Sequence, residues 1–147
     1  MQTYDDSNIF AKILRGEIPC TKVYEDEICL AFMDVMPQVE GHVLVIAKAP
    51  SRTLLDADPA VLSALMPRVQ TVGRAVVAAL KADGLTLMQF SEAPAGQTVF
   101  HLHFHLLPRR EGVSIRPHEG AMAKPEALSA LAERIRAELP ASSDPRL

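Results

Sequence analysis

The amino-acid sequence predicts an α+β protein built around an antiparallel sheet. Short strand-like runs alternate with helical patterns, the first strands are joined by short connections, and one long amphipathic pattern separates them from the last strands. The chain has 147 residues, of which 48% are hydrophobic and 22% are charged. This composition suits one hydrophobic core and excludes a disordered chain or a small disulfide-stabilised scaffold. We therefore expect a single domain over residues 1–147.

Charge and cysteine content narrow the classes of function. A net charge of −3 argues against a uniformly basic surface that coats nucleic acid. The two cysteines, Cys20 and Cys29, match neither a zinc nor a haem spacing, and we expect both to be reduced in a cytoplasmic protein. Residues 1–10 contain no apolar core run, and no apolar run in the chain can span a bilayer. We expect no signal peptide and no membrane partner.

The first helix is expected over residues 9–14. Its apolar side chains recur at the spacing of one buried helical face: Ile9, Phe10, Ile13 and Leu14. Ser7 or Asp6 is the expected N-terminal cap, because short polar side chains accept hydrogen bonds from the first helical amides. Gly16 is suited to end the helix, and Pro19 prevents it from resuming.

Three short strands are expected next, at residues 21–24, 28–34 and 42–47. The third is rich in valine, leucine and isoleucine, which is the composition of a central strand. Pro37 and Gly41 mark the turn between the second and the third strand. Because the connections are short, these strands are expected to form an antiparallel meander.

A long amphipathic helix is expected after Asp58, which would cap it, with Pro59 at its first position. Its buried face consists of apolar residues at helical spacing: Leu62, Leu65, Met66, Val69, Val72, Val76, Val77 and Leu80. Pro67 lies inside this pattern and is expected to kink the helix or to divide it into two. Gly84 is the expected end of the helix.

The same criteria assign the remaining segments. They are a strand at 85–90, a loop at 91–96, a strand at 99–107, a polar loop at 109–120, an amphipathic helix at 125–139 and a frayed tail at 140–147. The sequence shows no internal repeat and no linker. This absence supports one domain rather than two.

The chemically informative residues lie in the last expected strand. His101, His103 and His105 alternate along the chain. Because alternate side chains of a strand share a face, the imidazoles should lie on one face, roughly 6–7 Å apart along the strand. The opposite face is apolar and is expected to be buried: Leu102, Phe104 and Leu106.

The residues alone leave three interpretations of this histidine row open. The row can be the polar face of a half-buried strand. It can also hold a zinc ion, with His42 or Glu92 as a further ligand, because histidines two apart on a strand can share a metal. The third interpretation is catalysis, since imidazole is nucleophilic and moves protons near neutral pH.

The chain resembles the histidine triad (HIT) superfamily of nucleotide hydrolases and transferases, whose signature alternates three histidines with apolar residues. Residues 101–107 fit this signature at every position. Four further stretches resemble the family's opening helix, second strand, third strand and phosphate loop, in that order: residues 8–19, 30–35, 41–46 and 96–99. The resemblance spans residues 7–110, so the C-terminal helix is the least diagnostic part.

The resemblance implies a fold, an assembly and an activity. The fold is a HIT-like five-stranded antiparallel sheet with packed helices, in a homodimer whose two sheets join into a ten-stranded sheet. Each subunit would bind a purine nucleotide, with no required metal or other cofactor. The implied reaction is hydrolysis at the α-phosphate of a nucleoside 5′-phosphoramidate or a dinucleoside polyphosphate. It passes through a nucleotidyl-histidine intermediate and releases the nucleoside monophosphate.

The resemblance also assigns catalytic roles. His103, the middle histidine, would be the nucleophile, and in the family a backbone carbonyl holds its second ring nitrogen and fixes the tautomer. Three residues would donate hydrogen bonds to the α-phosphate: His105, Gln97 and Thr98. Such preorganised donors stabilise charge that develops in the transition state.

Further residues would orient the row and bind the nucleoside. His101 and His42 would hold the row from behind, and Asp34 would receive the ribose hydroxyls. Many family members have an asparagine after the fourth strand, where Phe90 or Ser91 stands here, and we assign Ser91 to this position. The apolar slot around the base would consist of Ile9, Phe10, Ile13, Phe32 and Val35.

Two departures from the family pattern affect the metal and the leaving group. Some members hold zinc with a Cys-x-x-Cys pair, where this chain has Asn8 and Ala11. The branch that prefers phosphoramidates ends in a tail that contains Trp-Pro, and this chain has no tryptophan. Residues 89–91 and 107–110 are more similar to the branch that cleaves dinucleoside polyphosphates. Arg109 and Arg110 could contact distal phosphates or form a solvated turn, so the leaving group stays open. The alternative functions are a nucleotide-binding dimer with slow turnover and a zinc-dependent hydrolase.

Overall fold

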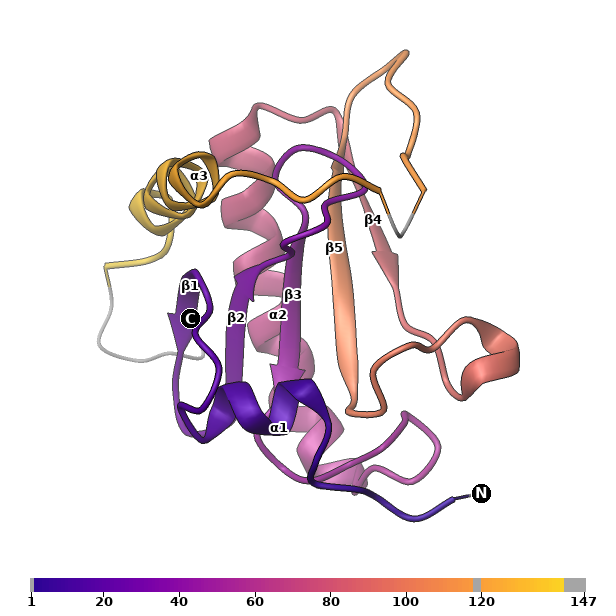
Figure 1. Ribbon diagram of the computed structural model, residues 1–147. Coiled ribbons are helices and arrows are strands. Elements are labelled where there is room, and N and C mark those ends of the chain that lie inside the picture. The colour runs from indigo at the N-terminus through magenta and orange to yellow at the C-terminus, as the bar shows by residue number, and fades with distance from the viewer. Residues whose placement is uncertain (1, 118–119, 142–147) are drawn as a thin grey trace.

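The computed structural model describes residues 2–117 and 120–141. In this part of the chain five strands form one antiparallel sheet in the order β1-β2-β3-β5-β4 (Figure 1). The strands are β1 (Lys22–Glu25), β2 (Cys29–Met33), β3 (Val43–Ala47), β4 (Gly84–Met88) and β5 (His103–Arg109). The expected α+β class and the meander of the first three strands are confirmed. Parts of the expected loop and tail, residues 118–119 and 142–147, lie outside the described residues.

Helices cover both faces of the sheet. They are α1 (Ile9–Leu14), α2 (Pro59–Leu80), the short 3-10 helix η1 (Ala93–Ala95) and α3 (Pro125–Ala137). In Figure 1, α2 runs behind the sheet, α1 crosses in front of its lower end, and α3 lies beside α2 and β1. No helix within the described residues is long and apolar enough to cross a membrane.

The expected bounds of the last two strands are wrong. β5 begins at His103 and not at Val99, because the chain before it bonds elsewhere: the Leu102 amide donates to the Ser51 carbonyl at 2.8 Å. β4 covers Gly84–Met88 rather than 85–90, and the chain then leaves the sheet toward η1 (Figure 1). The first three strands differ from expectation only at their end residues.

The cap of α1 also differs from expectation. Asn8 is the N-cap, and its side chain accepts a hydrogen bond from the Ala11 amide at 2.9 Å. Ser7 cannot serve, because its amide and its hydroxyl both donate to the Asp5 carboxylate, at 2.9 and 2.6 Å. The other expected cap, Asp6, is also wrong, because Asn8 occupies the N-cap position of α1.

Helix α2 runs without a break through Pro67, so the expected division into two helices is wrong. Pro67 and Ser63 both lie on the exposed side of α2, so water can reach the Ser63 carbonyl that a proline deprives of its partner. The helix ends at Leu80, followed by Lys81 in the left-handed conformation, with φ of 51°. Gly84 is therefore the first residue of β4 and not the end of the helix.

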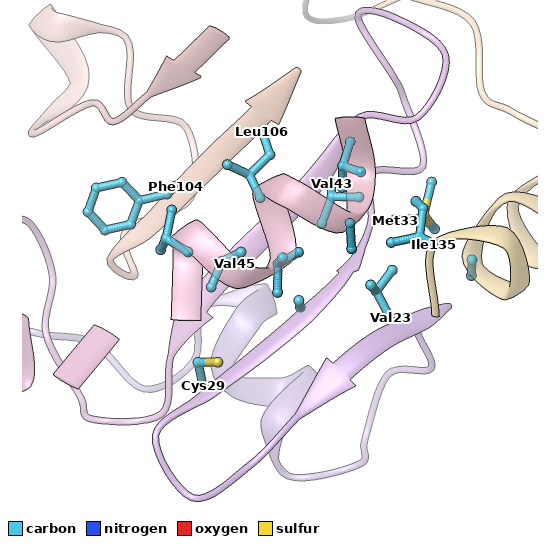
Figure 2. Packing of buried hydrophobic residues seen from close by; sticks show 14 of the residues in the cluster. Val23, Cys29, Met33, Val43, Val45, Phe104, Leu106 and Ile135 are labelled. Atoms are coloured by element: carbon cyan, nitrogen blue, oxygen red, sulfur yellow. The ribbon is translucent and has the colours of Figure 1, made fainter. Parts of the chain in front are cut away.

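The two faces of the sheet pack differently. On the face covered by α2 and α3, β2, β3 and β5 contribute to the larger apolar cluster, which Figure 2 shows around Met33, Val45, Leu106 and Ile135. On the face covered by α1, a smaller cluster consists of Phe10, Leu30, Phe32, Leu44 and Ile46. Successive residues of β2 and β3 alternate between the clusters, so both strands are buried on both sides. The smaller cluster leaves room on the α1 face for polar residues.

Candidate active site

Strand β5 places two histidines of the row side by side on the α1 face. The ring centroids of His103 and His105 lie 5.0 Å apart. His101 precedes the strand, and its buried ring contacts Phe10 on the same face. The expected apolar row is confirmed in the larger cluster: Leu102, Phe104 and Leu106. Because all three histidines are also buried, the interpretation of a half-buried strand is wrong.

A backbone contact orders the protons of His103. Its Nδ1 lies 2.6 Å from the main-chain carbonyl oxygen of His101. A carbonyl only accepts hydrogen bonds, so Nδ1 carries the proton, and the lone pair of the neutral ring belongs to Nε2. The ring thus combines a tethered N–H with a nucleophilic nitrogen on its opposite side.

His42 determines the opposite proton arrangement in His105. The Gln38 amide donates to His42 Nδ1 at 3.1 Å, so the neutral His42 ring carries its proton on Nε2. This Nε2 lies 3.0 Å from His105 Nδ1 and donates to it. The proton of neutral His105 is then on Nε2, which makes His105 a hydrogen-bond donor. His42 therefore lies directly behind His105, and the side chain of His42 is fully buried.

Asp34 follows β2 and lies beside this pair of histidines. One carboxylate oxygen accepts from the Met36 amide at 2.8 Å, and the other lies 3.5 Å from His42 Nε2. The side chain is largely buried, yet it lines the same cavity as His103 and His105. A carboxylate in such a place can accept hydrogen bonds from the hydroxyl groups of a ligand.

A cavity of about 240 Å³ lies between α1 and the histidine side of the sheet. Its polar lining consists of Asp34, Thr98, His103 and His105. Its apolar lining includes all five residues predicted for the base slot: Ile9, Phe10, Ile13, Phe32 and Val35. Ile9 and Val35 are 53% and 47% exposed, whereas the two phenylalanines belong to the smaller core cluster. An apolar cavity with a few convergent polar groups is typical of small-molecule sites.

Part of this lining was not predicted from the sequence. The cavity also contacts Ile18, Pro19, Cys20, Met33, Met36 and Leu44. Met33 and Met36 carry a sequence signal, because they directly follow the selected residues Phe32 and Val35. The segment after α1 carries none, since only the tertiary fold brings it to the cavity.

The side chain of Gln97 holds the loop between β4 and β5. Its oxygen accepts from the Glu92 amide at 2.6 Å, and its nitrogen donates to the carbonyls of Arg52 and Val99 at 2.8 and 3.1 Å. The Gln97 side chain is thereby bonded within the protein, and Thr98 is the member of the predicted pair that lines the cavity. Glu92, considered above as a zinc ligand, instead accepts two hydrogen bonds of 2.9 Å from Arg52.

The structure does not bring Ser91 to the cavity. Its hydroxyl donates to the side-chain oxygen of Gln89 at 3.1 Å. The neighbouring Phe90 is closer to the row, because its ring centroid lies 5.6 Å from that of His105. A contact between Ser91 and substrate stays a prediction.

The two arginines that follow the triad are engaged at the far end of β5. Arg109 donates to the Thr86 hydroxyl at 3.1 Å, and Arg110 donates to the Leu80 carbonyl at the end of α2. Both side chains thus bond to β4 or α2. Arg110 is exposed, as a solvated turn requires, whereas Arg109 is half-buried.

His101 differs from its two neighbours because its ring does not line the cavity. Its Nε2 lies 2.5 Å from the Ala47 carbonyl at the end of β3, so Nε2 carries the proton. The Tyr4 hydroxyl lies 2.7 Å from its Nδ1. Burial lowers the pKa of His101, which favours the neutral ring. No local pattern pointed to Tyr4, because it precedes His101 by 97 residues.

The residues at the opening helix do not fit a zinc ion. Asn8 uses its side-chain oxygen to cap α1, and Ala11 has no ligand atom. Within the described residues, one group of three potential ligands has its atoms within 4.8 Å of one another: Asp34, His42 and His105. The two imidazoles of this group are already joined by a hydrogen bond of 3.0 Å, which a metal would displace.

The chain is similar in sequence to known proteins. Residues 15–112 match the HIT domain family. The chain is 40% identical over 109 residues to adenylylsulfatase HINT3 of Arabidopsis thaliana, which covers 74% of this chain but only 55% of that protein. It is 37% identical over 109 residues to adenosine 5′-monophosphoramidase HNT1 of Saccharomyces cerevisiae, covering 74% and 66%. The chain thus spans about half to two thirds of the length of these relatives.

A solved structure agrees over a longer stretch. A Hit-like protein of Bartonella henselae, described as involved in cell-cycle regulation, superposes with a TM-score of 0.90 and 51% identity. The match covers 94% of this chain and all of that one. The sheet, the histidine row and the matched residues lead to the same assignment, and the chain belongs to the HIT domain family.

Proposed function

We propose that this protein is a nucleotide hydrolase that cleaves at the α-phosphate and uses His103 as its nucleophile. The observation that carries the proposal is the opposite proton order of two adjacent imidazoles. His103 Nδ1 is tethered to a carbonyl, while His105 Nδ1 accepts from His42. A lone pair and an N–H donor are thereby available from neighbouring rings that line one cavity.

In the first step, His103 Nε2 attacks the α-phosphorus of a nucleoside 5′-phosphate derivative. A nitrogen–phosphorus bond forms, the bond between phosphorus and the leaving group breaks, and the leaving group departs with the bonding electron pair. An amine leaving group also takes up one proton from solvent. The proton on Nδ1 stays shared with the His101 carbonyl, which stabilises the positive charge on the ring. The product of this step is a nucleotidyl-histidine.

In the second step, water attacks the same phosphorus. A phosphorus–oxygen bond forms, the attacking water releases one proton to solvent, and the bond to Nε2 breaks, so His103 regains its lone pair and the nucleoside monophosphate leaves. Replacement of one difficult displacement by two easier ones is the general advantage of a covalent intermediate. Neither step requires a metal ion.

The remaining cavity residues would bind the nucleotide. His105 and Thr98 would donate to the non-bridging oxygens of the α-phosphate, and Asp34 would accept from the ribose hydroxyls. The base would lie in the apolar slot that is opened to the surface by Ile9 and Val35. Because such a slot offers few polar atoms, a purine would be held mainly by contact with its faces.

The leaving group follows from the relatives only in part. Their names, adenylylsulfatase and adenosine 5′-monophosphoramidase, both support an adenosine 5′-phosphate derivative as the substrate to test. Arg109 and Arg110, the residues considered for distal phosphates, are bonded to Thr86 and Leu80. We therefore favour a phosphoramidate over a dinucleoside polyphosphate.

The proposal is tested by release of adenosine monophosphate in the presence of excess chelator. Adenosine 5′-phosphoramidate and a diadenosine polyphosphate are supplied separately to the wild-type protein and to His103→Ala. We expect turnover of the phosphoramidate by the wild type and none by the variant. Turnover only after zinc is added would overturn the proposal in favour of a zinc hydrolase. Thermal stabilisation by nucleotide without turnover would favour the binding protein.

We also propose that the protein is a homodimer joined at β4. This strand is at an edge of the sheet, and its Leu85 and Leu87 are 39% and 46% exposed next to the exposed Met66 of α2. Natural proteins usually cover an apolar sheet edge. Light scattering should give twice the chain mass for the wild type and one chain mass for Leu87→Glu. The matched control is Leu55→Glu, an exposed leucine outside this patch, which should stay dimeric.

A further inference from the structure

The chain that precedes α1 reaches the histidine row through Tyr4. The Tyr4 hydroxyl lies 2.7 Å from His101 Nδ1, and the two rings meet edge to face with centroids 5.6 Å apart. This contact joins residues that are 97 positions apart. Tyr4 does not line the cavity, so its effect on substrate is indirect.

The direction of this hydrogen bond is fixed by the other side of the ring. His101 Nε2 donates to the Ala47 carbonyl, so Nδ1 of the neutral ring is an acceptor and the Tyr4 hydroxyl is the donor. His101 is only 1% exposed, so water cannot readily replace the hydroxyl. Without Tyr4, a buried nitrogen would lack its partner, and the ring would be held at one end only.

His101 in turn contacts the nucleophile by two routes. Its main-chain carbonyl accepts from His103 Nδ1 at 2.6 Å. Its ring also lies against Phe10, whose centroid is 6.4 Å away, and Phe10 meets the His103 ring edge to face at 4.9 Å. A tilt of the His101 ring would therefore disturb both the carbonyl that fixes the His103 tautomer and the packing that fixes its angle.

We propose that Tyr4 is a positioning residue, which holds His101 so that His103 keeps its reactive nitrogen directed at the α-phosphate. This inference rests on the proposed function. It predicts that loss of the hydroxyl slows the chemical step but leaves nucleotide binding largely intact, because neither Tyr4 nor His101 lines the cavity.

The test compares the two tyrosines of the chain. Tyr4→Phe removes the hydroxyl at His101, and Tyr24→Phe is the matched control, because the Tyr24 hydroxyl donates to Asp26 away from the cavity. We expect Tyr4→Phe to lower kcat for monophosphate release by about 3- to 10-fold, the scale of one hydrogen bond. KM and the Kd of adenosine monophosphate should change by less than about twofold. All assays are run well below the Tm of each variant, so that unfolding does not contribute.

A second measurement reports on the contact without turnover. The ring ¹⁵N resonances of His101 in the full chain should identify an Nε2–H tautomer, and Tyr4→Phe should shift Nδ1 toward the position of an unbonded nitrogen. Equal kcat for the wild type and Tyr4→Phe, or an unchanged Nδ1 resonance, would overturn the inference. A parallel loss of kcat in Tyr24→Phe would also overturn it, because the effect would then not be specific to His101.

The two levels of proposal fail in different ways. If the wild-type protein releases no monophosphate from either substrate, the proposed function is wrong and the positioning role falls with it, whatever the nitrogen resonance shows. If the wild type turns over and Tyr4→Phe matches it, only the role of Tyr4 is wrong.

Discussion

The sheet carries a buried polar network on each face. We call the network on the α2 face the closed network and the network on the α1 face the open network. On the α2 face, Arg68 and Asp26 form an ion pair at 2.6 Å, and both side chains are almost fully buried. The Asp26 carboxylate also accepts from the Tyr24 hydroxyl and from the amides of Ile28 and Cys29. On the α1 face, imidazoles are linked to each other and to backbone groups, and two of them line a cavity.

The difference indicates which network supports the fold and which supports chemistry. Burial raises the pKa of Asp26, but its hydrogen bonds outweigh burial and the pKa of this carboxyl lies below its ordinary value. Its charge is thus balanced within the protein, and the network stabilises the native state. The histidine row instead uses its internal hydrogen bonds to order protons at a surface that a ligand can reach. We expect substitutions in the first network to change stability and those in the second to change activity.

The largest expected effect comes from breaking the closed network. Arg68→Met leaves the buried Asp26 charge without its ion-pair partner, which should lower the free energy of unfolding by about 3–5 kcal/mol. Urea unfolding followed by circular dichroism measures this loss. At a temperature where the variant is folded, kcat for monophosphate release should stay within about twofold of the wild type, since no residue of this network lines the cavity.

Glu27→Gln is the matched control for this variant. Glu27 lies 3.6 Å from the same arginine, but its side chain is 73% exposed. Loss of an exposed pair of this kind should leave the unfolding midpoint essentially unchanged. A large loss of kcat in folded Arg68→Met would contradict the separation of the two networks.

The next effect is expected in the open network. His105→Ala removes the proposed donor to the α-phosphate and should lower kcat by about 10²- to 10³-fold, the usual effect of one preorganised donor. The steady-state rate of monophosphate release measures this loss. The change leaves His42 Nε2 facing a vacated site, so a modest loss of stability is expected beside the large loss of activity. If kcat stays within threefold, His105 has no such role.

The two networks were not equally accessible from the sequence. The alternation of His101, His103 and His105 is local, so periodicity was enough to select them and to expect a common face. The start of β5 could not be predicted, because it depends on the hydrogen bond from the Leu102 amide to Ser51. The proton order was equally hidden, because the contact between His42 and His105 joins residues 63 positions apart.

The orientation of Gln97 shows the same limit at a single residue. Its position in the loop before the histidines was visible in the sequence, and the resemblance assigned it to the phosphate. Its side chain instead bonds to backbone groups of Glu92, Arg52 and Val99, one of which comes from the segment after β3. Only the tertiary fold determines whether a polar side chain in a loop faces a ligand or its own backbone.

A smaller effect is expected at Asp34, which borders the open network. Asp34→Asn keeps the oxygen that accepts from the Met36 amide but removes the charge that would bind the ribose hydroxyls. The Kd of adenosine monophosphate, measured by calorimetry, should rise by about 10- to 30-fold, because hydrogen bonds to a charged group are stronger than those to a neutral one. A deoxyribose nucleotide should lose much less affinity on the same substitution. Equal losses for both nucleotides would place the ribose elsewhere.

The smallest effect is a difference in pH dependence between the networks. Burial lowers the pKa of His101, so below its ordinary value of 6.5 the unfolded chain binds a proton that the native state does not. The unfolded state then gains protons as the pH falls, and stability decreases on acidification through this window. For this one group the loss between pH 7.5 and 5.5 is at most about 1.4 kcal/mol, set by the ordinary histidine pKa.

Two variants separate this contribution from that of the closed network. His101→Asn removes the titrating group and should flatten the dependence of the unfolding free energy on pH in this window. The pKa of Asp26 is already below its ordinary value of 3.8, so its contribution is complete above that pH and is lost only under more acidic conditions. Asp26→Asn should therefore lower stability by the same amount at pH 7.5 and pH 5.5. An equal change of slope in both variants would mean that the two networks titrate together, and the distinction between a structural and a chemical face would fail.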